Sequence, residues 1–433
     1  MTVKYDIHKR SPKINYPMAA SVLAALACFG VYSVQAATDA EIVLCTIDDT
    51  SGAFAAMATP KTWGYQLAVE EINAAGGIKV DGKIKTVKHV QYDGQSDVGR
   101  YSQLTQQCVF EDEADVIMAA YTGAEREAAR SEAVRNETIF WHNNQGEGGI
   151  ADHYSFFSGP TPEQQVLPAL KWMIEEFGPK MTFIGADYNF CRAIGDWART
   201  AAGLYGGDLV MEEYFPFDVT QWQKTIGDIQ SIGPDFQVHC LVGGDQVQFY
   251  PQAEAAGLKT PAWSNVTIAD GYEHKIFPAP QLSNMHVPPG YIEDVPGSNS
   301  EAFVAKIRKR HPNAPYVNEH AGFGYTAVKA MAKAWAKAGT TETESVIKAL
   351  ESGISVEEAP GGSWEMVGDQ HHAAMPTYLF RVNDDHSLSL ITNLGVNAPS
   401  FLKDIGVDVR KLKSGDGYSY LPRDNPAWKK FFK

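Results

Sequence analysis

Positively charged residues are scarce in this sequence. It contains 37 Lys and Arg residues against 52 Asp and Glu residues in a chain of 433, and its formal net charge is −15. Proteins that bind nucleic acid neutralise its phosphates with clustered cations. The acidic balance therefore argues against nucleic acid as the main partner.

Motifs for catalysis and nucleotide binding are also lacking. The sequence has no GxxxxGK[ST] loop and no GxSxG elbow. The segment from Gly322 to Ala327 matches GxGxxA, but it is predicted to lie inside a helix with no strand before it. His371 and His372 could ligate a metal, although a solvated pair beside a hairpin is the simpler interpretation. We predict no catalytic residue, no metal and no cofactor.

Long apolar runs are absent beyond the first 36 residues. Residues 18–31 form an apolar run that is too short to span a bilayer, and four cations precede it. Residues 34–36 offer a small-residue cleavage site, so we predict that residues 1–36 are a signal peptide and that the mature protein is soluble in the periplasm. A lipoprotein anchored at Cys28 is the less favoured alternative, because Ala25 stands where a larger aliphatic residue is usual.

Only four cysteines remain after the predicted signal peptide, and an even number permits three complete pairings. Their spacings match no zinc motif. Pairing Cys45 with Cys108 and Cys191 with Cys240 keeps each bond within one predicted domain, which an exported protein permits. Four buried free thiols are an equally good interpretation.

The rest of the chain alternates apolar strands with helices of 10–15 residues. Examples are the strands at 41–47, 114–121 and 181–187, each followed by a helix. A pair of antiparallel strands is predicted near the end, around Asp384 and Asp385. This alternation predicts parallel βαβ units, so the fold class is α/β with two doubly wound sheets, one after the other.

Polar and aromatic residues follow the predicted strands, where open parallel sheets bind their ligands. We predict a ligand cleft lined by these strand ends. From the first sheet the candidates are Ser51, Tyr121, Thr122, Gly123, Trp141, His142, Asn143 and Asn144. From the second sheet they are Asp187, Tyr188, Phe190, Asp245 and Asn265, with Asp270 nearby. Thr122 and Gly123 could equally form only the turn into a helix, and Asp187 and Asp245 could be helix caps.

Two groups of motifs resemble a known family. LAVEEINAAGGI at 67–78 and YDGQSD at 92–97 resemble the start of type I periplasmic binding proteins of the leucine/isoleucine/valine-binding-protein type. YTGAEREA at 121–128 and FIGADYNF at 183–190, preceded by SGPTPE at 158–163, resemble its urea and short-chain amide branch. Amide binders tend to carry Ser where Gly123 stands, and Tyr-Pro-Thr in place of residues 142–144.

The resemblance implies two lobes joined by three hinge crossings, near residues 154–158, 288–291 and 358–362. One lobe would comprise residues 37–156 with 290–358, the other residues 157–289 with 359–398, and residues 399–433 would be a C-terminal extension. Independently of the resemblance, residues 403–433 carry eight cations against four acids, which predicts a solvated, partly ordered tail. The resemblance also implies that a small-molecule solute is trapped between the lobes and delivered to a membrane ABC permease, without catalysis. We expect a monomer or weak dimer.

The solute predicted first is urea or a short-chain amide, bound by Thr122, Asn143, Asn144 and Asp187. An amino acid is the second candidate, with its carboxylate on backbone N–H groups at Thr122. A methylated ammonium in an aromatic cage of Tyr121, Trp141, Tyr188 and Phe190 is the third. A secreted hydrolase and a sensor subunit for a membrane receptor are alternatives from other classes.

Overall fold

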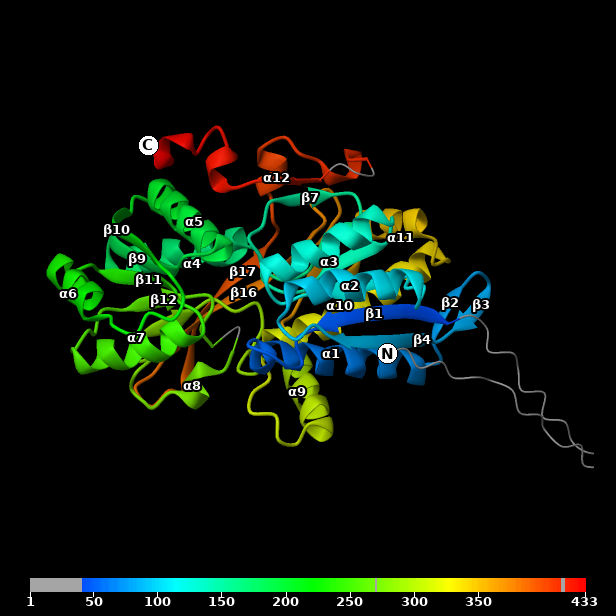
Figure 1. Cartoon of the computed structure of the whole chain (residues 1–433), viewed down its shortest axis with the longest axis horizontal. Helices are drawn as coiled ribbons and strands as arrows, with labels where there is room; N and C mark the ends of the chain where they lie inside the picture. The colour runs from blue at the N-terminus through cyan, green and yellow to red at the C-terminus, as the bar shows by residue number, and fades with distance from the viewer. Residues whose placement is uncertain (1–40, 269–270, 414–416) are drawn as a thin grey trace, which may run out of the picture. The chain divides into compact units, whose positions relative to one another are not determined.

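The computed structural model describes residues 41–268, 271–413 and 417–433. The predicted signal peptide and Asp270 lie outside the described residues. Fourteen strands form one large sheet, whose main path runs β10-β9-β11-β12-β13-β16-β8-β6-β5-β1-β4 (Figure 1). These strands are β1 (Ile42–Asp48), β4 (Val87–Asp93), β5 (Val116–Ala119), β6 (Ile139–His142), β8 (Ser155–Phe157), β9 (Lys180–Ala186), β10 (Asp208–Phe215), β11 (Phe236–Cys240), β12 (Ala262–Ser264), β13 (Met285–Val287) and β16 (His372–Val382).

The sheet has two halves, each made of parallel strands. The β1 half comprises β8, β6, β5, β1 and β4, and the β9 half comprises β10, β9, β11, β12 and β13. The α/β class with mostly parallel strands is confirmed. The sequence predicted two separate sheets, whereas β16 joins them, because this strand of 11 residues pairs with β8 at His372 and with β13 at Phe380 and Arg381.

Shorter strands complete the structure. The predicted antiparallel pair is confirmed as β16 with β17 (Leu388–Asn397), whose register joins Val382 to Leu388. Two strands that the sequence did not predict, β2 (Ile78–Val80) and β3 (Lys83–Lys85), form a hairpin. The remaining strands are β7 (Ile150–Asp152), β14 (Ser355–Val356), β15 (Trp364–Val367) and β18 (Gly417–Ser419).

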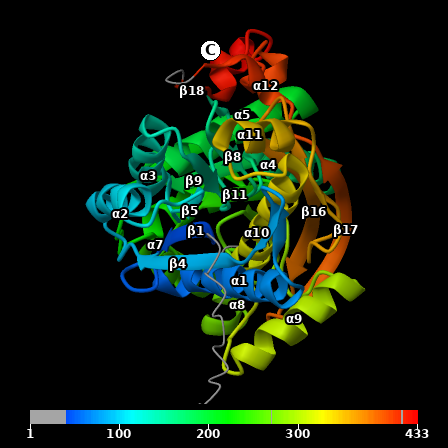
Figure 2. The same cartoon turned by 90° about the vertical axis from the view of Figure 1, so that its right-hand side faces the viewer.

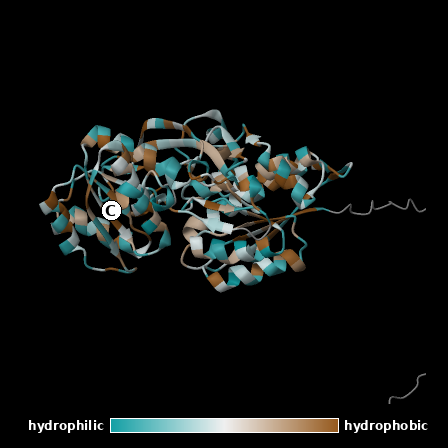
Figure 3. Cartoon of the chain, turned by 90° about the horizontal axis from the view of Figure 1, so that it is seen from above, coloured by the Kyte–Doolittle hydropathy of each residue, from teal (hydrophilic) through white to brown (hydrophobic). Residues whose placement is uncertain are grey.

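Helices that carry both hydrophobic and hydrophilic residues surround the strands (Figures 2 and 3). They are α1 (Ala55–Ala74), α2 (Val98–Phe110), α3 (Gly123–Arg135), α4 (Pro162–Phe177), α5 (Asn189–Tyr205), α6 (Gln223–Ile232), α7 (Gly244–Ala255), α8 (Glu273–Ile276), α9 (Ser298–Arg310), α10 (Glu319–Ala338), α11 (Thr343–Glu351) and α12 (Phe401–Asp404). Among the described residues no helix is both long and apolar enough to cross a membrane.

Helices α1 and α10 lie side by side and pack very closely (Figure 2). A Cβ atom on Gly64 of α1 would lie 2.1 Å from the carbonyl oxygen of Ala321, and one on Gly324 would lie 2.5 Å from that of Lys61. Only glycine allows the two backbones to approach this closely. The GxGxxA segment thus lies inside a helix, as predicted, and its glycines serve helix packing.

The C-terminal segment, residues 399–433, packs against the rest of the protein, whereas the sequence predicted a solvated, partly ordered tail at residues 403–433. Its strand β18 pairs antiparallel with β7, which lies in the chain between β6 and β8 of the β1 half. Its first helix, α12, is held by Glu163 of α4, which accepts hydrogen bonds from the backbone N–H groups of Ser400 and Phe401. The segment therefore contacts elements of both halves (Figure 1).

The end of this segment returns to helix α5. Arg423 forms an ion pair with Asp196 at 2.6 Å, and the Trp428 ring lies 5.6 Å from the ring of Trp197 and 5.7 Å from that of Phe401. The prediction of a solvated tail was wrong because it counted the lysines of this segment and overlooked its aromatic residues, which bury apolar surface.

Both pairs of cysteines form disulfides, Cys45–Cys108 and Cys191–Cys240. The first joins β1 to α2 within the β1 half, and the second joins α5 to β11 within the β9 half. Of the interpretations left open by the sequence, the pairing within domains is the one in the structure, and the free-thiol alternative is wrong.

Candidate functional site

A cleft of about 640 Å³ is lined by residues from both halves of the sheet. The β1 half contributes the residues before and within the first turns of α1 and α3, and the loop after β6. The β9 half contributes residues at the starts of α5, α7 and α8. The lining side chains include Phe54, Met57, Tyr121, Thr122, Glu125, Gln145 and Glu147 from the β1 half, and Tyr188, Phe190, Phe217, Gln246, Tyr272, Glu273 and Phe277 from the β9 half.

The residues that follow β5, Tyr121, Thr122 and Gly123, form a tip whose conformation is fixed by a capping box. Thr122 is the N-cap of α3, and its hydroxyl accepts a hydrogen bond from the Glu125 N–H. In return Glu125 Oε2 accepts from the backbone N–H groups of Tyr121, at 3.2 Å, and Thr122, at 2.7 Å. This S/T-x-x-E pattern is a sequence-readable helix start. Burial, with repulsion from Asp49, raises the pKa of Glu125 to about 7.

A buried ion pair holds the backbone directly before the tip. Lys61 of α1 lies 2.6 Å from the Asp48 carboxylate at the end of β1, and both side chains are at most 1% exposed. Its ammonium also donates a hydrogen bond of 2.7 Å to the carbonyl of Ala120, whose φ of 80° is unusual for a residue with a side chain. Burial raises the pKa of Asp48, and Lys61 opposes that rise.

Five of the predicted site residues line the cleft. They are Tyr121, Thr122 and Gly123 from the β1 half, and Tyr188 and Phe190 from the β9 half. The structure thus brings together the two tips that the sequence singled out after β5 and β9.

Four predicted residues, in the last part of β6 and directly after it, do not line the cleft. Asn143 accepts a hydrogen bond of 2.9 Å from the Tyr65 hydroxyl, and Asn144 donates one of 2.6 Å to the Tyr121 carbonyl. His142 is buried against the Ala119 carbonyl, and burial lowers its pKa well below the usual value. Trp141 is fully buried and donates to the Ser158 hydroxyl. None of the four is among the residues that line the cleft.

The other four predicted residues also lie off the cleft lining. The Ser51 hydroxyl donates a hydrogen bond to the Asp93 carboxylate, and Asp187 forms an exposed ion pair with Arg192 at 2.6 Å. Asp245 is buried and accepts from the backbone N–H of Val219. Asn265 is also buried, and its amide lies 3.4 Å from Gln145 Oε1, so it contacts a residue of the lining.

Sequence reasoning missed several lining residues, among them Glu125, Glu147, Phe54 and Phe217. Glu125 had a signal, because it completes the capping box after Thr122. Glu147 lies in the loop after β6, and a loop has no hydrophobic periodicity that would indicate which way its side chains point. Its Oε1 would lie 2.5 Å from a Cβ atom on Gly123, so a larger residue there would require the Glu147 side chain to shift. Its Oε2 accepts a hydrogen bond of 2.6 Å from the buried guanidinium of Arg126.

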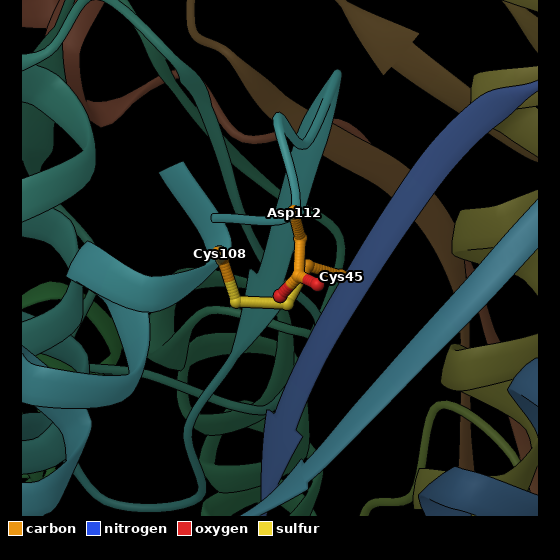
Figure 4. Close-up of side chains that lie close together, drawn as sticks. All are labelled: Cys45, Cys108 and Asp112. Atoms are coloured by element: carbon orange, nitrogen blue, oxygen red, sulfur yellow. A yellow bond between two sulfur atoms is a disulfide. The ribbon is translucent and has the colours of Figure 1, made fainter. Parts of the chain in front are cut away.

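The described residues contain one group of side chains close enough to share a metal ion, formed by Cys45, Cys108 and Asp112. Figure 4 shows that the two sulfur atoms are bonded to each other beside the Asp112 carboxylate. Metals bind cysteine as the thiolate. A disulfide has no thiolate, so this group is not a metal site.

Histidines 371 and 372 are buried rather than solvated, which corrects the sequence interpretation. The His371 ring stacks on Phe156 at 4.1 Å, and that of His372 on Phe157 at 4.6 Å. They pack where β16 meets β8, and burial lowers the pKa of His372 to about 4.

Several known proteins are similar to this chain. Leu/Ile/Val-binding protein homolog 8 of Brucella abortus (strain 2308) is 24% identical over 325 residues, which cover 67% of this chain and 77% of the relative. Homolog 7 of Brucella suis biovar 1 is 21% identical over 358 residues, covering 77% and 86%.

Solved structures share the fold. A solute-binding protein of an ABC transporter from R. palustris, in complex with benzoate, has a TM-score of 0.70 at 18% identity and covers 83% of this chain and 98% of its own. A branched-chain amino acid transporter substrate-binding protein of Streptococcus pneumoniae, in complex with isoleucine, has a TM-score of 0.67 at 20% identity, covering 83% and 100%.

The family model described as "Periplasmic binding protein" matches residues 41–387, which include both halves of the sheet and every residue of the cleft discussed above. The chain therefore belongs to the periplasmic binding protein family, in its type I form.

Proposed function

We propose that this protein is the extracytoplasmic solute-binding component of an ABC uptake transporter. In this proposal the β1 half and the β9 half are the cores of two lobes, with the boundaries and hinge crossings given above. The observation that carries the proposal is the cleft of about 640 Å³ with lining residues from both halves. A solute that enters it contacts both lobes.

The mechanism is capture by hinge closure. Contacts that a solute makes with Tyr121 and Thr122 on one lobe and with Tyr188 and Phe190 on the other exist together only when the lobes close. The solute therefore shifts the population towards the closed form. A membrane permease would then recognise the rim of that form. Binding alone is sufficient for this role, and no bond of the solute needs to break.

Urea or a short-chain amide, the solute favoured by the sequence, loses part of its support. Of its four predicted partners only Thr122 lines the cleft, while Asn143, Asn144 and Asp187 do not. Gln145 and Gln246 also line the cleft. The Gln246 amide nitrogen already donates to the carbonyls of Leu241 and Val266, which leaves the side-chain nitrogen of Gln145 and the side-chain oxygen of Gln246 to bind an amide. An amino acid is the second candidate, because similar proteins are Leu/Ile/Val-binding protein homologs and one similar structure holds isoleucine.

Thermal unfolding of the mature protein from Ala37 onward tests the proposal, after denaturation and refolding have removed any solute carried over from the cells. A solute that binds only the folded state raises the midpoint, with about 2.7 kcal/mol of stabilisation at a hundred times its dissociation constant. We expect one chemical class among urea, amides, amino acids and organic ammonium ions to raise it. Native mass spectrometry of the protein as purified should show one small molecule per chain. If neither experiment finds a solute, the proposal is wrong.

The alternative role as a sensor subunit shares this cleft and differs only in its partner. Genes for a permease and an ATPase beside the gene of this protein would support transport. A gene for a membrane receptor in their place would support sensing.

A further inference from the structure

The charged residue types that line the cleft are all acidic. Three carboxylates line it, those of Glu125, Glu147 and Glu273. Among the described residues of the lining there is no Lys, Arg or His. A bound carboxylate needs a cation or several N–H donors to replace its hydration. Besides the side-chain amides of Gln145 and Asn189, the donors that could serve it here are the backbone N–H groups at the helix starts.

The N–H groups of the tip after β5 are already used. Those of Tyr121 and Thr122 both donate to Glu125 Oε2, at 3.2 and 2.7 Å. These are the groups to which an amino-acid carboxylate was assigned from the sequence. The internal carboxyl group of Glu125 occupies the position that a bound carboxylate would take, so these donors are not free to bind one.

A second carboxylate lies next to the same tip. Glu147 approaches Gly123 so closely that its Oε1 would lie 2.5 Å from a Cβ atom there. A serine at this position, which amide binders tend to carry, would require the Glu147 carboxylate to move. The nearby cation, Arg126, is about 6% exposed and does not line the cleft. It is shared between Glu147 at 2.6 Å and Glu127 at 3.0 Å.

Aromatic rings cover the walls on both sides of these carboxylates. In the β1 half, Phe54 stacks on Tyr121 with 5.1 Å between ring centroids. In the β9 half, the Tyr188 ring lies 6.2 Å from that of Phe190 and 5.5 Å from that of Phe217. Aromatic faces attract cations and also bury apolar groups.

We propose that the solute is an organic cation with an apolar body, an alkyl- or arylalkylammonium ion, and that Glu147 contributes the negative charge that selects it. The carboxylates and ring faces attract the ammonium group, and the apolar lining takes up its substituents. The inference rests on the proposed function, because it assigns the solute class of the same cleft.

Two series of compounds matched in shape test the charge preference. Choline and 3,3-dimethylbutan-1-ol have the same shape, but a carbon atom of the alcohol replaces the charged nitrogen. Benzylamine, benzyl alcohol and benzoate present the same ring with a positive, zero and negative charge. Calorimetric titration of the solute-free protein should show binding of a cation from at least one series. Its neutral partner should bind at least about tenfold more weakly, and benzoate should not bind.

Two variants of one ion-pair network test the role of Glu147. Glu147→Gln and Glu127→Gln each remove one carboxylate that pairs with Arg126, but only Glu147 lines the cleft. We expect Glu147→Gln to weaken cation binding about fivefold to tenfold, and Glu127→Gln to leave it within about twofold of the parent protein. The midpoints of thermal unfolding without ligand show whether both variants fold.

The possible failures can be told apart. Equal binding of the neutral partners, binding of benzoate or leucine in place of the cations, or an equal effect of both variants would overturn the inference. The proposed function would stand in those cases, because a solute still binds. If no compound of either series binds and mass spectrometry identifies a neutral or anionic native solute, the inference also fails alone. If no solute of any kind is found, the proposed function fails with it.

Discussion

At the scale of single residues, the positions of the cleft residues depend on buried groups that do not line the cleft. Lys61 is fully buried under the tip, where its ammonium neutralises Asp48 and binds the carbonyl of Ala120. Ala120 keeps its left-handed backbone because its carbonyl is held by Lys61 and its N–H donates to the Ile47 carbonyl. Tyr121 and Thr122 follow directly, so their position depends on this buried pair.

Replacing Lys61 with methionine should therefore be costly. The change leaves the Asp48 carboxylate buried without its cation, and breaking a buried pair in this way costs about 3–5 kcal/mol. Urea unfolding of Lys61→Met measures the loss. In the double variant Lys61→Met/Asp48→Asn part of the stability should return, since no charge is left buried. A single variant within about 1 kcal/mol of the parent protein would contradict this description of the pair.

The Glu125 carboxyl predicts an effect of pH. Its pKa rises from 4.5 to about 7 on folding, so the folded state holds this proton more tightly than the unfolded state. Through this group the free energy of unfolding falls as the pH rises from about 4.5 to about 7. Glu125→Gln removes the effect, and the variant should gain stability relative to the parent protein over that range.

Denaturant unfolding at about pH 5 and about pH 8 measures this difference. Glu127→Gln is the control on the same helix, since two arginines lower the pKa of Glu127. The stability contributed by Glu127 is lost only as the pH falls below about 4.5, so its removal should not change the slope above that pH. Parallel pH profiles for the parent protein and Glu125→Gln would argue against a raised pKa.

Only some of the residues that line the cleft could be predicted from the sequence. Tyr121, Thr122, Gly123, Tyr188 and Phe190 were found because they follow two strongly apolar strands. Position after a strand does not determine which way a side chain points, however. Asn143 and Asn144 follow β6 as predicted, but their amides turn back to Tyr65 and to the Tyr121 carbonyl. Sequence cannot distinguish an amide that holds the tip from one that binds a ligand.

At the scale of elements, the crossing of α1 and α10 depends on glycine. Gly324→Ala would place a methyl group 2.5 Å from the Lys61 carbonyl oxygen, so the helices would have to separate. Overpacking of this kind costs about 1–3 kcal/mol.

Gly227→Ala in α6 is the matched control, because nothing lies within 4 Å of its added Cβ atom. Alanine favours helix over glycine, so this variant should be as stable as the parent protein or more stable by up to about 1 kcal/mol. The difference between the two variants is read from their unfolding midpoints. Equal effects would show that the close approach of α1 and α10 is unimportant.

Element boundaries were predicted well where a cap marks them. The T-x-x-Q pattern of Thr161 and Gln164 is a readable helix start, and it begins α4. Ser96 and Asp97 are both suitable cap residues, and Asp97 is the one that caps α2. Proline favours the first helical position, which would start α1 near Pro60, but the helix begins at Ala55 and contains Pro60. Its N-cap residue is Phe54, whose side chain offers no capping oxygen, so the first turn carried no signal.

At the scale of the whole molecule, the C-terminal segment ties the two halves together. It begins on α4, pairs with β7 and ends on α5, where Trp428 packs against Trp197 and Phe401. Trp428→Ala should lower the free energy of unfolding by about 1–3 kcal/mol, less than at a fully buried site because the ring is half-buried. Lys433→Ala, at the exposed end of the chain, is the control. Equal stability of the two variants would mean that the segment adds little to the fold.

The joining of the halves also explains what sequence could not predict. The alternation of strands and helices established the α/β class and the two groups of parallel strands. It could not show that β16 continues from one group to the other, because the partners of His372 in β8 and of Phe380 in β13 lie more than 80 residues away in sequence. The packing of residues 399–433 was likewise invisible in local patterns.

In the proposed mechanism a solute closes the two halves over the cleft. Small-angle X-ray scattering of the solute-free protein, repeated with the solute that binds it, measures this closure. The radius of gyration should be smaller with the solute, because closure brings the halves together. A solute that binds in the cleft and leaves the radius of gyration unchanged would show that binding does not close the protein.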